Sequence, residues 1–252
     1  MVPRFARSFL IVGAFALACL AGPGVAAAAV GIDSYKITSD MPLGTTPSDG
    51  PSTTQAGANP DAGSWSTFTY PNASEDLHTA ITNFAPGLLG NPESVPKCPQ
   101  ADLEAGGLTC PAGSQIGTSR LLAVVAGTSI PAANLAGRFY NAVPLGNEPG
   151  RLAAVTDTAF GPLVSSIPFE ITPRGGGDYG LTGTLTDISR LPSPPFPANL
   201  QVRGLGFVIN ASSKYVRNPT SCQFGISTGQ AAGYDDPTFV DGPPYGLSLI
   251  HI

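Results

Sequence analysis

The chain has 252 residues, of which 31 are glycine and 26 are proline, and only 12% of its residues are charged. A net charge of −5 without a basic patch argues against nucleic acid and against anionic membrane surfaces as partners. The apolar fraction of 42% is too high for a disordered chain, so the many Gly and Pro residues indicate a β-rich domain with many turns.

The first 29 residues, 1–29, have the layout of a secretory signal peptide. Two arginines precede an apolar run over residues 9–20, and four alanines end at Ala29 as a small-residue cleavage site. The run is shorter than the roughly 20 residues of a membrane span, so we predict cleavage near Ala29 and no span afterwards. The exported chain then has a net charge of −7. Lipidation of Cys19 stays open as a minor alternative, because the aliphatic residue usual three positions before such a cysteine is missing.

The segment after the signal peptide predicts little regular structure. Residues 30–51 are rich in Pro, Gly, Ser and Thr and show no helical period, which indicates an extended lead-in with at most one edge strand. Apolar and polar residues then alternate over 65–70 and again over 77–81. Both segments are predicted strands.

Cys98 and Cys110 lie twelve positions apart in a chain that we expect to be exported. Thiols oxidise outside the cytoplasm. A zinc site needs about four ligands, and the exported chain offers only three cysteines, His78 and His251. The spacing is also far looser than that of a redox CxxC pair. We therefore predict a Cys98–Cys110 disulfide, which leaves Cys222 unpaired within this chain.

One short helix is predicted, inside the loop that this disulfide would close. Residues 99–105 begin with a proline and end before a Gly-Gly pair, which is the asymmetry typical of helix ends. Further strand patterns follow along the chain, at residues 115–125, 135–143, 152–158, 163–171 and 200–209.

The segment 163–171 has the strictest alternation of the chain, and Pro168 within it predicts an edge strand or a bulge. A Gly-rich turn at 173–178 then predicts a hairpin. The three glycines do not predict a phosphate-binding loop, because a strand pattern and not a helix follows them.

These elements predict an all-β fold, an antiparallel β-sandwich of Ig-like or related type, built on residues 52–246. The last six residues, 247–252, read LSLIHI and do not continue the composition of the domain. They resemble the translated adapter sequence that ends many assembled reading frames. We therefore predict a non-native tail on a C-terminally truncated domain.

Residues able to perform catalysis are scarce, and we predict no catalytic residue and no cofactor. His78 lies within a predicted strand without an evident nucleophile, and no GxSxG elbow is present. Glu75 and Asp76 are adjacent carboxylates, but they fall in turn-like sequence, where acidic residues are common for backbone reasons. Neither pattern indicates an enzyme.

A calcium site is the least weak of the site hypotheses. Asp235, Asp236 and Asp241 fall within seven residues, and calcium takes carboxylate and carbonyl oxygens. Their spacing does not match an EF-hand loop, and calcium usually needs more oxygen ligands than these three side chains supply. We therefore expect no metal site and keep the three aspartates only as weak candidates.

Six short motifs follow one another along the chain. They are TTQAGANPD (53–61), PGLLGNPESVPKC (86–98), CPAGSQIGT (110–118), FYNAVP (139–144), GGDYGLT (176–182) and NPTSC (218–222). Taken in this order, the set resembles a family of large, uncharacterised secreted or cell-surface proteins of high-GC actinobacteria. The resemblance implies an extracellular location, a β-sandwich organisation and a further cysteine past Tyr245 that would pair with Cys222. It implies no catalytic residues.

We therefore expect a non-catalytic extracellular or cell-surface module, structural or adhesive, whose partner in the extracellular space or the cell envelope is unknown. The alternative is a secreted carbohydrate-binding module or an accessory domain of a hydrolase. Such a module would present aromatic side chains on one sheet face, so burial of Trp65, Tyr70, Tyr140 and Tyr179 would favour the first reading.

Overall fold

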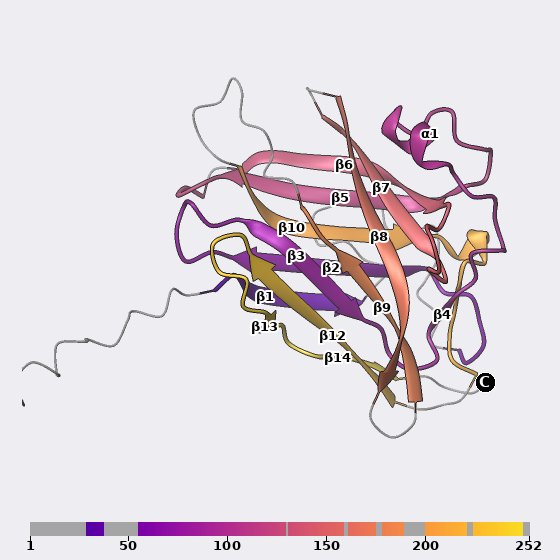
Figure 1. Ribbon diagram of the computed structural model, residues 1–252. Helices are drawn as coiled ribbons and strands as arrows, with labels where there is room; N and C mark the ends of the chain where they lie inside the picture. Colours follow the sequence, from indigo (N-terminus) through magenta and orange to yellow (C-terminus); the bar gives the residue numbers. More distant parts are fainter. Residues whose placement is uncertain are drawn as a thin grey trace, which may run out of the picture.

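A computed structural model supplies the fold, and its regular structure is almost entirely antiparallel β-sheet (Figure 1). This confirms the predicted all-β class. The helix α1 (Gln100–Glu104) and one 3-10 turn, Ala211–Ser213, are the helical segments of the described chain, and neither is long and apolar enough to cross a membrane. The structure describes residues 29–37, 55–129, 131–158, 161–174, 178–188, 200–220 and 224–248.

One continuous path of paired strands folds over on itself to form two layers. The first layer runs in the order β1 (Gly31–Ile37), β2 (Ala62–Thr69), β10 (Leu200–Ile209), β5 (Gln115–Val125), β6 (Pro131–Ala142), β7 (Arg151–Thr158) and the first part of β8 (Gly161–Arg174). The second layer continues through the rest of β8, β9 (Asp178–Leu185), β3 (Leu77–Asn83), β12 (Phe224–Gly233) and β13 (Val240–Asp241), with β14 (Tyr245–Ser248) also paired to β12.

Strand β8 belongs to both layers and makes the corner between them. It pairs with β7 up to Pro168, which lies opposite Arg151, and with β9 from Phe169 onward. Proline has no amide hydrogen for a sheet ladder, so it is best tolerated where one pairing ends and the next begins. The edge or bulge predicted at Pro168 is therefore this corner, where the amide of Phe169 donates to the carbonyl oxygen of Gly150 at 3.0 Å.

Apolar side chains between the layers form two clusters. The first lies toward the short pair made by β4 (Leu89–Gly90) and β11 (Val216–Arg217), which sits at one end of the first layer (Figure 1). The second fills the other end. Members of the first include Ile116, Phe139, Leu152, Phe169 and Tyr215, and members of the second include Phe68, Leu77, Leu121, Leu185 and Val202.

The outer face of the first layer is also covered where β6, β7 and β8 run side by side. Strand β7 is buried on both faces: Leu152 and Ala154 contact the interior, whereas Ala153 and Val155 contact a third apolar cluster. That cluster contains Leu103 of α1 (Gln100–Glu104) together with Cys98 and Tyr140, so the disulfide loop covers this face.

The strands predicted between residues 65 and 171, and over 200–209, all occur, with ends that move by up to four residues. The predicted helix is one residue shorter at each end. β1 is the edge strand allowed for in the expected lead-in, and it pairs with β2. The short strands β4, β11, β13 and β14 were not predicted, and neither was β12, whose small-residue sequence, FGISTGQAAG, has no clear alternation. Leu247 and Ser248, from the segment set apart as a tail, pair with Gly225 and Phe224.

Candidate functional site

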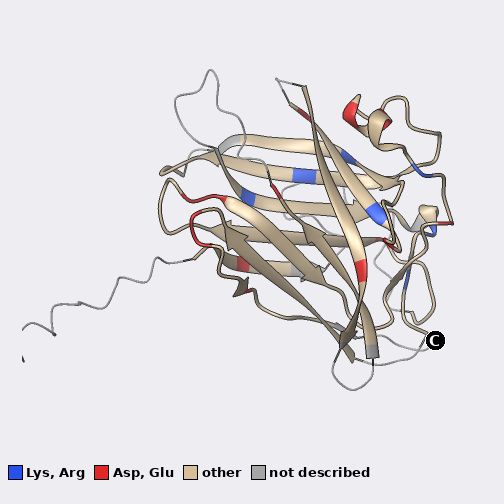
Figure 2. Ribbon diagram, in the orientation of Figure 1, with Lys and Arg blue, Asp and Glu red and all other residues tan. Residues whose placement is uncertain are grey.

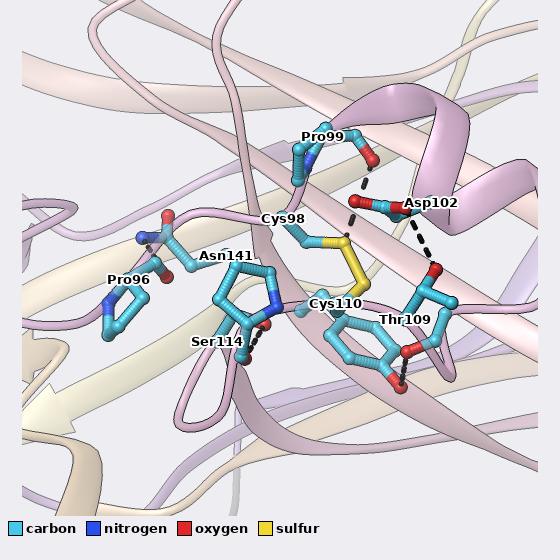
Figure 3. Close-up of a disulfide and its surroundings, with 11 residues drawn as sticks. Pro96, Cys98, Pro99, Asp102, Thr109, Cys110, Ser114 and Asn141 are labelled. Carbon is cyan, nitrogen blue, oxygen red and sulfur yellow. Dashed lines mark hydrogen bonds between the residues drawn. A yellow bond between two sulfur atoms is a disulfide. The ribbon is translucent and has the colours of Figure 1, made fainter.

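Cys98 and Cys110 form the predicted disulfide, with their Cα atoms 5.0 Å apart (Figure 3). Cys98 is fully buried, and its backbone is bonded into the sheet. Its amide donates to the carbonyl oxygen of Asn141 at 2.7 Å, and its own carbonyl oxygen accepts from the amide of Val143 at 3.0 Å. The disulfide therefore closes a loop whose first residue is already paired with the end of β6. Cys222 lies outside the described residues.

Two side-chain hydrogen bonds also stabilise the loop that the disulfide closes, one within the loop and one from β6. The hydroxyl of Thr109 donates to the carboxylate of Asp102 at 2.8 Å, and the hydroxyl of Tyr140 donates to the carbonyl oxygen of Gly107 at 3.1 Å. Gly107 has a φ of 74°, and a Cβ atom there would lie 2.9 Å from the Tyr140 oxygen. Only glycine fits this close approach without strain.

The three aspartates considered for calcium are not brought together as a site. The Asp236 carboxylate accepts from the amide of Thr238 at 3.0 Å, and hydrogen bonds from Thr238 hold the pKa of Asp236 below its ordinary value. Asp241 accepts from the side chain of Gln230 at 2.7 Å, and Asp235 accepts from the hydroxyl of Ser74 at 3.5 Å. Among the described residues, no three His, Cys, Asp or Glu side chains group as metal ligands.

Glu75 binds the backbone of the turn at residues 234–236, a structural role that the sequence did not reveal. It is buried, and its carboxylate accepts backbone N–H bonds from Tyr234, Asp235 and Asp236 at 2.9–3.0 Å, besides one from Asp76 at 2.9 Å. A carboxylate that accepts several backbone amides holds a turn in place and leaves few lone pairs for chemistry. The sequence YDDP after Gly233 is therefore the turn that caps a buried glutamate.

Neighbouring polar residues extend this network into the first layer. The buried side chain of Gln201 on β10 donates to the carbonyl oxygens of Asn72 at 2.9 Å and Glu75 at 2.8 Å. The carboxylate of Asp76 accepts from the amide of Leu77 at 2.8 Å. These groups join β10 to the start of β3, which accounts for polar side chains in the interior.

His78 lies between a carboxylate and a hydroxyl. Its Nε2 atom is 3.3 Å from Asp187, its Nδ1 atom is 2.8 Å from the hydroxyl of Thr79, and its ring packs edge-on against Tyr234 at 4.5 Å. An acid, an imidazole and a hydroxyl are also the parts of a nucleophilic triad. Here the hydroxyl belongs to the next residue in the chain and Thr79 is only 7% exposed, so a substrate carbonyl cannot approach it.

Of the four aromatic residues named as candidates for a sugar-binding face, only Tyr179 is exposed. Trp65 and Tyr140 are buried, and the half-buried Tyr70 donates from its hydroxyl to a backbone carbonyl of β10. Tyr179 on β9 is 62% exposed and Phe224 on β12 is 67% exposed, but β3 lies between these two strands. This burial favours a structural role for most of the aromatic residues over a sugar-binding platform.

A pocket does open at the end of the sandwich, beside β4 and β11. Its enclosed volume is about 80 Å³, and it opens to solvent. Its walls come from both layers and include Leu152 of β7, Phe169 of β8 and Phe207 of β10. Among the described residues, no charged side chain lines it, and the hydroxyl of Tyr215 is its one polar side-chain group.

Tyr215 sits at this pocket as a buried residue, 3% exposed. Its ring lies against β4, where a Cβ atom on Gly90 would be 3.1 Å from the ring. Burial raises the pKa of Tyr215. Its hydroxyl has no hydrogen-bond partner among the described residues. The ring is therefore buried, whereas its hydroxyl oxygen is not fully buried and opens onto the pocket.

Sequence reasoning missed the pocket because its walls meet only after folding. Leu88, Leu152, Phe169 and Phe207 look like ordinary core residues when each is seen on its own strand. Tyr215 gave no useful signal either, because its position near the charged Lys214 and Arg217 suggests an exposed residue.

The chain matches no known protein family, no curated protein and no solved structure.

Proposed function

We propose that this chain is a non-catalytic structural or adhesive module of an extracellular or cell-surface protein. One observation carries the proposal: the polar side chains that could perform catalysis are used to hold the backbone. Glu75 binds four backbone amides, and the hydroxyl beside His78 is buried. The alternatives considered from the sequence each need an exposed reactive group or an aromatic face, and the described residues present neither as a set.

Three observations support the extracellular location. The Cys98–Cys110 disulfide is of the kind that persists in oxidising compartments, and its loop covers a sheet face that would otherwise expose apolar side chains. The N-terminal 29 residues have the composition of an export signal. The resemblance to secreted proteins of high-GC actinobacteria points to the same location.

A substrate panel tests the absence of catalysis. We expect the purified full chain to show no turnover of chromogenic esters, peptides or glycosides above a matched His78→Ala variant. His78 is the one imidazole in the described chain that lies beside both a carboxylate and a hydroxyl. Reproducible turnover that disappears in the variant would overturn the proposal.

A reporter fusion tests the location. The full chain fused at its C-terminus to alkaline phosphatase, an enzyme active only where its disulfides form, should give activity in an actinobacterial host. The control is the same fusion without residues 1–29, which should be inactive. Equal activity of the two fusions would contradict export through this N-terminus.

A further inference from the structure

We propose that the interior of the sandwich binds a neutral, single-chain amphiphile, which enters tail first through the pocket beside β4 and β11 and places its polar end at Tyr215. The inference goes beyond the module proposed above, because it assigns a ligand class to a site that neither export nor the absence of catalysis requires.

Two smaller cavities adjoin the pocket toward the interior. A second cavity lies between the two layers and shares Phe84, Phe169 and Phe207 with the outer pocket. A third cavity shares Ser119, Ser165 and other residues with the second. The three cavities therefore follow one another from the end of the sandwich into its middle, and the side chains of Phe84, Phe169 and Phe207 form the wall between the first two. A row of this shape matches an extended alkyl chain better than a compact ring.

Small side chains create the inner space. Residues that face it include Ser64 and Ser66 on β2, Ser119 on β5, Ser165 on β8 and Gly183 on β9. Two packed sheets lie about 10 Å apart, a distance that large apolar side chains normally fill. Serine and glycine do not fill it. Protein interiors are close-packed, and an empty cavity destabilises the fold, so a hollow in this position is better explained by an occupant.

Several hydroxyls line the row, and two of them are placed to meet a ligand. The hydroxyl of Tyr215, whose residue is 3% exposed, opens onto the outer pocket. Ser119, also buried, has an Oγ atom without a hydrogen-bond partner in the lining of both inner cavities. Buried hydroxyls are normally hydrogen-bonded, so each is a place where a ligand oxygen or a water that enters with it gains a bond.

Charge at the mouth selects a neutral head group. The nearest cation to the lining residue Gly150 along the chain is Arg151, whose guanidinium donates to Glu148 at 2.8 Å. Arg217, next to the lining residue Val216, donates to the carbonyl oxygen of Gly57 at 3.2 Å. Lys214, next to Tyr215, is exposed and does not line the outer pocket, and Arg120 lines only the innermost cavity. A carboxylate or phosphate would find no cation among the described residues that line the outer pocket, and burying an unpaired charge is unfavourable. An alcohol or an ester meets the hydroxyl of Tyr215 without that penalty.

Calorimetric titration of the full chain with n-alkanols tests the assignment. We expect saturable binding of 1-decanol, with affinity rising about fourfold per methylene from hexanol upward until the chain fills the row. Sodium decanoate at pH 8 should bind at least tenfold more weakly than decanol. The absence of saturable binding by every alkanol, or equal binding of decanoate, would overturn the proposal.

Three variants locate the site. Ala62→Phe places a ring in the outer pocket and should weaken decanol binding at least tenfold. Ser165→Leu fills the inner space and should lower the chain length at which affinity stops rising. Tyr215→Phe removes one hydroxyl and should weaken decanol binding about three- to tenfold, as the loss of one hydrogen bond does.

Tyr179→Phe is the matched control for Tyr215→Phe, since it removes a hydroxyl from an exposed tyrosine outside the pocket and should leave binding unchanged. Circular dichroism establishes that each variant is folded. If Ala62→Phe does not fold, the conservative Tyr215→Phe and the alkanol series still decide the question. Unchanged decanol binding in folded Ala62→Phe, or equal losses in the two tyrosine variants, would contradict the assigned site.

Discussion

The two faces of the first layer differ in how tightly they are packed. On the outer face of β6 and β7, the disulfide loop leaves little space: Leu103 and Cys98 are fully buried against the sheet, and the buried polar groups Ser114 and Tyr140 both have partners. On the inner face, serines and a glycine leave a row of cavities, and Ser119 has no partner for its hydroxyl. The outer face of β6 and β7 is thus tightly covered by the disulfide loop, whereas the interior between the two layers keeps unfilled space.

Charged residues follow the same division. Lysine and arginine lie along strands of the first layer, and many of the acidic residues lie on loops and strand ends (Figure 2). None of them reaches the lining of the outer pocket among the described residues. The inner face, with its cavities, is thus lined largely by small and apolar residues. The outer face is held by the disulfide and by hydrogen bonds of the loop that it closes.

Breaking the disulfide should have the largest effect on stability. The double substitution Cys98→Ala/Cys110→Ala removes a loop constraint and loosens the cover of β7, so we expect the free energy of unfolding to fall by about 2–4 kcal/mol. Urea unfolding of the variant and the oxidised protein measures the difference. A loss below about 0.5 kcal/mol would show that the loop packs as well without its covalent bond.

The buried carboxylate provides a second strong tie, made of hydrogen bonds alone. Glu75→Gln keeps the shape but places an NH₂ group among amides that need an acceptor, so we expect a loss of about 2–3 kcal/mol in the free energy of unfolding. Glu170→Gln, on an exposed carboxylate of β8, is the control and should change stability by less than about 0.5 kcal/mol. Equal effects of the two substitutions would contradict the role given to Glu75.

Two buried serines, one near the disulfide and one in the inner cavities, test the difference between these two environments most directly. Ser114 is buried near the disulfide and its hydroxyl donates to the carbonyl oxygen of Pro111 at 2.8 Å, so Ser114→Ala should lower the free energy of unfolding by about 1 kcal/mol. Ser119 is buried in the hollow without a partner, so Ser119→Ala should raise it by up to about 1 kcal/mol. Thermal and urea unfolding measure both, and effects of the same sign would show that the two environments do not differ.

The smallest effect is expected at the rim of the pocket and depends on pH. The hydrogen bond from Arg151 holds the pKa of Glu148 below its ordinary value of 4.5. A carboxyl with a lowered folded-state pKa stabilises the fold above its unfolded pKa, and this contribution is lost as the pH falls through the folded pKa.

Glu148→Gln should therefore cost less than about 1 kcal/mol at pH 7, and the gap to the natural protein should close on acidification below about pH 4. Urea unfolding at a series of pH values measures it. A gap that stays constant down to the lowest pH would show that Glu148 acts through packing and not through charge.

Much of the fold could be read from the sequence where the signal is local. Alternation over 115–125 and 200–209 predicted strands whose ends agree with the structure, and the Pro and Gly-Gly pair around 100–104 predicted the helix. β12 was missed because its small residues carry no periodic apolar signal, and its pairing with β3 decides its structure. Pro168 was recognised as a disruption, but its role as a corner depends on which strands lie on either side of it.

The sequence by itself determined the all-β class, the disulfide and the scarcity of catalytic groups, because each follows from residue type, spacing or period along the chain. Only the tertiary structure decided that Glu75 is an anchor for the 234–236 turn and that Phe84, Phe169 and Phe207 stand between two cavities. These facts join residues up to 161 positions apart in the chain, as Glu75 and Asp236 are. Side chains of this kind acquire their roles from partners that the order of strands in the sheets supplies, and that order is not written in any local pattern.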